Sequence, residues 1–151
     1  SNKPIGELQP NEAMLFHNMK RGVDRIDNVR ALEAPLWSHN LRLAGRVDCV
    51  AEFDGKLSII DFKGSTRKKN PTKITNYFCQ ATAYSIMWHE MMGESIDQIV
   101  VLISSEDGAN QIFVKHPLEF VPELKRVIDV YYKANPKHLL TTDESSQTLF
   151  T

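Results

Sequence analysis

The stretch that decides the fold covers residues 45–63 and reads GRVDCVAEFDGKLSIIDFK. Asp54-Gly55, at its centre, is a residue pair that two-residue type I′ hairpin turns prefer. Apolar residues alternate along both sides of this pair, which predicts two antiparallel strands over residues 41–53 and 56–63. A turn of this kind fixes which residues of the two strands lie opposite each other. In the first strand, the residues expected to share one side are Leu41, Leu43, Val47 and Cys49.

That register brings two acids and a lysine together. Asp48 and Asp61 each lie six positions from the nearer turn residue, so they are expected to face each other across the hairpin. Asp61 and Lys63 are two residues apart and leave the same face of a strand. An acid two residues before a lysine also occurs at residues 54–56, in the turn, and at residues 123–125, in an expected helix. Only residues 61–63 combine a strand end with a second acid on the partner strand.

Such a cluster suits metal-dependent hydrolysis. Two close carboxylates repel each other unless a cation lies between them, and Mg²⁺ and Mn²⁺ prefer oxygen ligands. A bound ion lowers the pKa of a water ligand and neutralises charge on a phosphate. A nearby lysine can position that water, help to deprotonate it or stabilise the transition state. The alternative is a structural ion pair between Asp61 and Lys63, and the spacing alone leaves both interpretations open.

The remaining segments predict a small α/β domain. Helical spacing predicts helices over residues 11–21 and 72–92, and a last helix from Pro122 to about residue 133. Residues 99–103 and 111–115 have the composition of strands. The expected architecture is therefore a mixed β-sheet flanked by helices. The long helix should end at Gly93, and its buried stripe should comprise Ile74, Tyr77, Phe78, Ala81, Ser85, Trp88, Met91 and Met92.

The long helix and the loop before it carry excess positive charge. Residues 62–89 contain no Asp or Glu, although the whole chain has a net charge of −1. An anionic partner would explain this distribution, and a solvated loop without a partner is the alternative. Gln80 and Tyr84 lie four residues apart and share a helix face that could look toward Asp61 and Lys63. The cations of this segment are Lys63, Arg67, Lys68, Lys69 and Lys73.

Length and composition are those of one ordinary globular domain. The chain has 151 residues, of which 42% are hydrophobic and 25% charged, and no apolar run reaches the length of a membrane span. Cys49 and Cys79 are expected to be buried free thiols, which favours a reducing intracellular compartment and excludes a four-cysteine metal site in this chain. Because the chain starts at Ser1 without an initiator methionine, we expect it to be part of a longer protein.

Three motifs, in this order, resemble those of a known nuclease family. Gly45-Arg46-Val47-Asp48, Asp61-Phe62-Lys63 and QATAY at residues 80–84 look like the GxxD, DxK and QxxxY motifs of the PD-(D/E)xK nuclease superfamily, RecB-like branch. Residues 29–63 are also similar to the mitochondrial genome maintenance exonuclease family and its phage and bacterial relatives. The resemblance covers roughly residues 29–119. It implies a restriction-endonuclease-like fold, with residues 1–151 as one nuclease domain that lacks upstream residues and ends in a polar tail at 141–151.

The resemblance also implies a metal site. Asp48 and Asp61 would bind Mg²⁺ or Mn²⁺, aided by the backbone carbonyl of Phe62. Glu33 is an additional candidate ligand, because relatives carry an acid before the first strand. The family often has a metal-binding histidine further upstream; His17 is expected to be a surface residue, so the counterpart would precede Ser1.

The other implied roles concern the substrate. Lys63 would act on the attacking water, and Gln80 and Tyr84 would orient the site or the DNA strand. The residues expected to contact nucleic acid are Arg67, Lys68, Lys69, Lys73 and Tyr77, of which Tyr77 could instead be a core residue.

The implied activity is that of a metal-dependent DNA exonuclease that prefers single strands or free ends. Its compartment would be the cytoplasm of a bacterium or a phage-infected cell, or the mitochondrial matrix. Two other classes stay open: a nucleic-acid-binding domain that keeps the fold without the activity, and an interaction domain whose basic loop binds an acidic protein.

Overall fold

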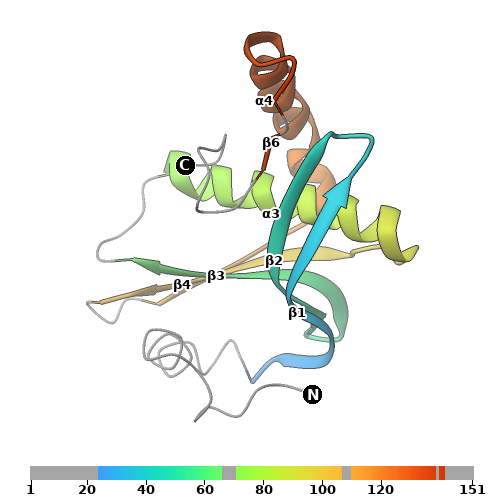
Figure 1. Ribbon diagram of the computed structural model, residues 1–151. Helices are drawn as coiled ribbons and strands as arrows, with labels where there is room; N and C mark the ends of the chain where they lie inside the picture. The colour runs from blue at the N-terminus through green and yellow to red at the C-terminus, as the bar shows by residue number, and fades with distance from the viewer. Residues whose placement is uncertain (1–23, 66–70, 107–109, 139, 142–151) are drawn as a thin grey trace.

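The computed structural model describes residues 24–65, 71–106, 110–138 and 140–141, which form a mixed sheet and its covering helices (Figure 1). The helix expected over residues 11–21, His17, the loop residues 66–70 and the tail beyond Thr141 lie outside these ranges. The elements are β1 (Ile26–Ser38), β2 (Leu43–Phe53), β3 (Lys56–Ser65), α3 (Pro71–Met92), β4 (Gln98–Ser105), β5 (Gln111–Lys115), the 3-10 helix η2 (Pro117–Phe120), α4 (Val121–Ala134) and β6 (Leu140–Thr141).

The sheet is mixed, as the sequence predicts. Its strand order is β1-β2-β3-β4-β5, and the short β6 pairs with β2. β3 runs parallel to β4, and β2 runs parallel to β6, whereas the other neighbours are antiparallel. Parallel neighbours need a long crossover, and α3 supplies it between β3 and β4. Because α3 starts where β3 ends, the end of β3 and the first turns of α3 belong to the same corner of the molecule.

Two apolar clusters cover the two faces of the sheet. The helix-side cluster packs sheet residues such as Val47, Val50 and Ile59 against α3 and α4. The far-side cluster is smaller and consists of Cys49, Ala51, Phe53, Ile60, Val100 and Leu102, with Ile26, Val29 and Phe62 packed against it. Every residue of β4 is buried, which is the pattern of a strand covered on both faces. Both cysteines are free and buried, as predicted.

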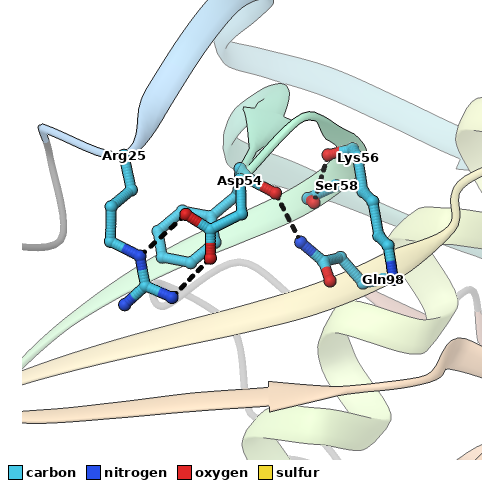
Figure 2. Close-up of polar contacts among 6 residues, drawn as sticks. Arg25, Asp54, Lys56, Ser58 and Gln98 are labelled. Atoms are coloured by element: carbon cyan, nitrogen blue, oxygen red, sulfur yellow. Dashed lines mark hydrogen bonds and ion pairs between the residues drawn. The ribbon is translucent and has the colours of Figure 1, made fainter.

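The hairpin turn between β2 and β3 has the expected geometry. Asp54 has a φ of 52° and Gly55 a φ of 80°, the two left-handed residues that a type I′ turn requires. Figure 2 shows how neighbouring segments hold this turn: Arg25 forms an ion pair with Asp54, and the Nε2 of Gln98 donates to the carbonyl of Phe53 at 2.7 Å. These contacts stabilise the register from Phe53–Lys56 to Cys49–Ile60.

β1 is a long strand that the sequence reading missed. Its outline is irregular: Asn28 and Glu33 have φ values of 47° and 46°, and the pairing with β2 shifts between Asp27 and Ala31. Pro35 lies inside the strand, where its missing N–H is tolerated because β1 is at the edge of the sheet. These features hide the alternation on which strand prediction depends.

The β1–β2 ribbon bends in the middle, and both strands bend at the same place. A regular strand presents every second residue to one face. Here the residues that reach the helix-side cluster are three apart on each strand, Ala31 and Ala34 on β1 and Val47 and Val50 on β2. The prediction that Cys49 shares a side with Val47 is therefore wrong, because Cys49 lies beyond the bend and packs in the far-side cluster.

The helices follow the sequence closely, with one exception at the end of α3. Gly93 has a φ of 73° and its N–H donates to the carbonyl of His89 at 2.9 Å, as a helix-ending glycine does. The predicted buried stripe holds from Phe78 to Trp88, but Met91 and Met92 are 38% and 56% exposed. The helix runs past the covered part of the sheet there. None of the described helices is long and apolar enough to cross a membrane.

Gly64 and Gly55 provide a matched pair of stability tests. A Cβ at either residue meets nothing within 4 Å, but only Gly55 has a left-handed φ, of +80°. Gly64→Ala should raise the free energy of unfolding by about 0.5–1 kcal/mol, because alanine restricts the unfolded chain. Gly55→Ala should lower it by about 1 kcal/mol or more, because an L-residue is strained there. Denaturant melts of both variants check this, and a stabilised Gly55→Ala would contradict the turn geometry.

Candidate active site

Asp48 and Asp61 meet where β2 and β3 begin to separate. The last paired residues on this side are Cys49 and Ile60, and the next step of the register places Asp48 opposite Asp61. At this step the side chain of Asp48 contacts the backbone of β3: its Oδ2 accepts a hydrogen bond from the N–H of Phe62 at 2.8 Å. Asp61 is only 4% exposed. The predicted juxtaposition of the two acids is therefore present, with both carboxylates largely removed from water.

This proximity is electrostatically unfavourable. Burial, followed by the charge of Asp61, raises the pKa of Asp48 well above its ordinary value. The hydrogen bond from Phe62 and the charge of Lys63 act in the opposite direction but do not compensate. The Oδ2 of Asp61 is buried, and within the described residues it accepts no hydrogen bond. Among those residues, the cation that pairs with it is the Nζ of Lys63 at 3.0 Å, in an ion-pair geometry that falls short of a hydrogen bond.

Lys63 is held by its strand neighbour and by α3. Its Nζ donates to the Oε1 of Gln80 at 3.1 Å, and the Nε2 of Gln80 donates to the hydroxyl of Tyr84 at 3.2 Å. The ring of Tyr77 lies under the ammonium, 4.8 Å from Nζ to the ring centroid. Burial lowers the pKa of Lys63, whereas the charge and hydrogen bond of Asp61, with smaller contributions from Asp48 and Tyr77, raise it, and the net shift is upward. The ammonium therefore stays protonated and in one place.

Lys63, Gln80 and Tyr84 link the parallel strand β3 to its crossover helix, beside two acids that share one side of the hairpin. A family model described as the PD-(D/E)XK nuclease superfamily matches residues 9–143. The chain belongs to the PD-(D/E)XK nuclease superfamily. The mixed sheet with its helices is consistent with the restriction-endonuclease-like fold of this superfamily, as predicted.

Two relatives carry the name mitochondrial genome maintenance exonuclease 1. The protein from Homo sapiens is 38% identical over 60 residues, which cover 34% of this chain and 17% of the relative. The protein from Mus musculus is 38% identical over 80 residues, which cover 48% of this chain and 23% of the relative. The chain thus matches less than a quarter of the length of these relatives.

The structure brings five predicted site residues of this superfamily member into one cluster: Asp48, Asp61, Lys63, Gln80 and Tyr84. The side chain of Phe62 packs against the far-side cluster, while its backbone stays beside Asp48. Among the nucleic-acid-binding candidates, Lys73 is exposed in the first turns of α3, and Arg67, Lys68 and Lys69 lie outside the described residues.

Tyr77 has a contact that sequence reasoning did not assign to it. It was expected either to touch nucleic acid or to lie in the core, and the structure packs it partly against the helix-side cluster with Lys63 over its ring. The signal was available in the spacing, because Tyr77, Gln80 and Tyr84 are three and four residues apart and lie on one helix face.

Glu33 is positioned by the bend of the ribbon. The pairs on either side of it, Leu32 with Cys49 and Ala34 with Val47, place Glu33 directly across from Asp48. Three acids therefore occupy one row across β1, β2 and β3. The side chain of Glu33 is exposed, and no group of three His, Cys, Asp or Glu side chains is gathered for a metal ion in the described part of the chain.

The repulsion at Asp48 makes a stability prediction for the metal-free protein. A carboxyl group whose pKa is raised by folding destabilises the fold when it is ionised, so the penalty grows as pH rises from the ordinary pKa toward the raised one. Asp48→Asn removes this penalty and keeps an oxygen to accept the N–H of Phe62. In EDTA at neutral pH, the variant should be more stable by roughly 1 kcal/mol, the scale of one unit of pKa shift.

Thermal melts between about pH 4 and pH 8 measure the effect, which should shrink toward the ordinary carboxyl pKa of about 3.9. Asp129→Asn, at an exposed position of α4, is the matched control and should change little. A variant that is less stable than the wild type at neutral pH would show that the two carboxylates are compensated in the metal-free protein.

Proposed function

We propose that this domain is a metal-dependent deoxyribonuclease, acting as an exonuclease on single strands or free ends. The observation that carries the proposal is the buried pair of Asp48 and Asp61, whose mutual repulsion is not balanced by the surrounding residues. A fold has little reason to keep such a pair for stability alone, because replacing one member would relieve it. A divalent cation supplies the missing charge.

The available donors fit a hard cation. Two carboxylates and the backbone carbonyl of Phe62 are oxygen ligands, which Mg²⁺ and Mn²⁺ prefer. Mg²⁺ keeps several waters and often needs only one or two protein carboxylates, so a cluster of three side chains is not required. Glu33 is the additional candidate, because its backbone lies in the same row as both acids. In such a site a divalent ion activates a bound water and neutralises charge on the phosphate.

Lys63 supplies a fixed positive charge in this mechanism. Its Nζ lies 3.0 Å from the Oδ2 of Asp61 and donates to Gln80, a position from which an ammonium orients the water and stabilises charge on the phosphate. Gln80 keeps the ammonium beside Asp61, and Tyr84 keeps the amide of Gln80 in place. The latter two are positioning residues.

The choice of DNA and of an exonuclease follows the relatives, both named as mitochondrial exonucleases. The same proposal has three further parts. The chain would belong to the RecB-like branch, would form a single domain within a longer protein, and would act inside a bacterial cell or a mitochondrion. The basic residues at 66–70 and Lys73 would attract the phosphate backbone, and Tyr77 lies at the site with its ring against Lys63.

Loss of either central residue should abolish cleavage. With labelled single- and double-stranded DNA, Asp61→Ala and Lys63→Ala should reduce Mg²⁺- or Mn²⁺-dependent cleavage by at least about 100-fold, the scale of a lost charge-stabilising group. Lys63→Ala should still bind DNA, because most affinity comes from the remaining phosphate contacts. EDTA should abolish cleavage by the wild type.

Lys56→Ala, at the exposed turn end of the hairpin, removes the same charge as Lys63→Ala and should leave cleavage unchanged. Cleavage that survives Asp61→Ala would move the active site elsewhere. DNA binding without cleavage, in the natural protein with all its residues, would instead identify a nucleic-acid-binding domain that retains the fold.

The loop cations make a separate prediction. Replacing Arg67, Lys68 and Lys69 together by alanine should weaken DNA binding and reduce the salt dependence of the affinity, by up to about 2 in the slope of log K against log salt for a single strand. Binding titrations at several salt concentrations measure the slope. An unchanged slope would mean that the loop is solvated and contacts no phosphate.

A further inference from the structure

The outer face of the β1–β2 ribbon carries an ordered row of side chains that starts at the site. The strand register pairs Pro35 with Arg46 and Trp37 with Ala44, the next two steps from Glu33 and Asp48. Residues directly opposite each other share a face, and alternate pairs repeat that face. On β1 the burial alternates accordingly, since Leu36 and Ser38 are buried and Pro35 and Trp37 are exposed. The row therefore runs from the acids to Arg46 and then to Trp37.

Arg46 is set apart from the other described arginines, because it has no partner among the residues that the structure describes. Its side chain is exposed, and it has neither an ion pair nor a hydrogen bond to any part of the chain that the structure describes. The other arginines in those ranges are all engaged, with Arg25 on Asp54, Arg30 on Glu94, Arg42 on Tyr132 and Arg126 on Glu123. A guanidinium close to the proposed phosphate-hydrolysing site, and not paired with a carboxylate of the described residues, is suited to a second phosphate.

Trp37 is an exposed aromatic on a fixed backbone. The residue is 56% exposed, whereas the other tryptophan of the chain, Trp88, is 4% exposed. The backbone N–H of Trp37 donates to the Sδ of Met91 at 3.3 Å, and the hydroxyl of the neighbouring Ser38 donates to the carboxylate of Glu90 at 2.9 Å. The end of β1 is thus attached to the end of α3, and the indole presents its surface to solvent.

The spacing of the row matches an extended nucleic-acid strand. Two residues along a strand span roughly 7 Å, so Arg46 lies about that far along β2 from Asp48, and the Trp37 pair lies about 13 Å away. One step of this size separates neighbouring phosphates of an extended strand. Stacking on an aromatic side chain requires an unpaired base, because the faces of paired bases are covered by their neighbours in a duplex.

We infer that Arg46 and Trp37 form a binding subsite for single-stranded DNA, in which Arg46 holds the phosphate next to the scissile one and Trp37 stacks on a base further along the same strand. The inference rests on the proposed function for the position of the scissile phosphate. It assigns the strand a direction across the protein, from the acids along the β1–β2 ribbon toward the end of α3.

Tryptophan fluorescence tests the subsite without any cleavage. The wild-type protein is titrated with an oligothymidylate in EDTA, with acrylamide accessibility measured in parallel. We expect quenching of the exposed Trp37 and protection of it from acrylamide, with Trp88 silent because it is buried. Trp37→Ala should remove the quenching and weaken binding of a labelled oligothymidylate by about ten-fold, within the range for one stacked base.

Arg46→Ala should weaken binding of the same oligonucleotide and lower the salt slope by about 0.7, the contribution of one phosphate contact on a single strand. Leu118→Ala, 71% exposed on η2, and Arg126→Ala on α4 are the matched controls, and both should bind as the wild type does. Melting curves show whether each variant is folded. The quenching measurement uses the wild-type protein and therefore does not depend on the folding of any variant.

The outcomes separate this inference from the proposed function. Absent quenching, or unchanged affinity in folded Trp37→Ala and Arg46→Ala proteins, overturns the subsite, and normal metal-dependent cleavage would leave the nuclease proposal standing. Quenching without any cleavage supports the subsite and opposes the nuclease. Equal quenching by a blunt duplex overturns the single-strand assignment. The assignment is also overturned if only a protein partner, and no oligonucleotide, changes the fluorescence of Trp37.

Discussion

The repulsion between Asp48 and Asp61 is the constraint on which the rest of the site depends. Two partly or fully buried carboxylates at the separating end of a hairpin raise the free energy of the folded chain, and one ammonium and one backbone N–H do not offset this. The protein tolerates the pair because the large apolar core on the helix side stabilises the strands that carry it. On the proposed function, stability is thereby exchanged for a place that would bind a cation, a common relation at active sites.

The geometry of that pair is set at the other end of the hairpin. A slip of one residue would turn Asp61 to the opposite face, so the register must be exact over the whole length from the turn to the acids. Asp54 and Gly55 determine the register locally, and Arg25 and Gln98 hold the turn from two other segments. This is why the hairpin register could be predicted from a short stretch of sequence: the rule that fixes it involves only the turn and its neighbours.

The parts that could not be predicted depend on contacts between distant segments. The spacing of Gln80 and Tyr84 showed that they share a helix face, but only the crossover from β3 to β4 places that face over Lys63. β1 was missed because its irregular backbone hides the strand pattern. Cys49 was assigned to the wrong side because regular alternation does not hold across the bend, and Cys49 packs in the far-side cluster.

The bend at Glu33 and Asp48 lies between the acid pair and the outward-facing residues that lead to Trp37, the inferred path of the DNA strand. On one side of the bend, Cys49–Phe53 of β2 pair with β3 within the sheet, and on the other side the β1–β2 ribbon rises across α3, as Figure 1 shows. The left-handed backbone of Glu33 is strained for an L-residue and lies where three acids form one row, so the strain coincides with the site. Beyond the bend, Pro35 and Trp37 face outward and alternate with the buried Leu36 and Ser38. In a straight ribbon, the side chains between the acids and Trp37 would point in a different direction from the one they take here.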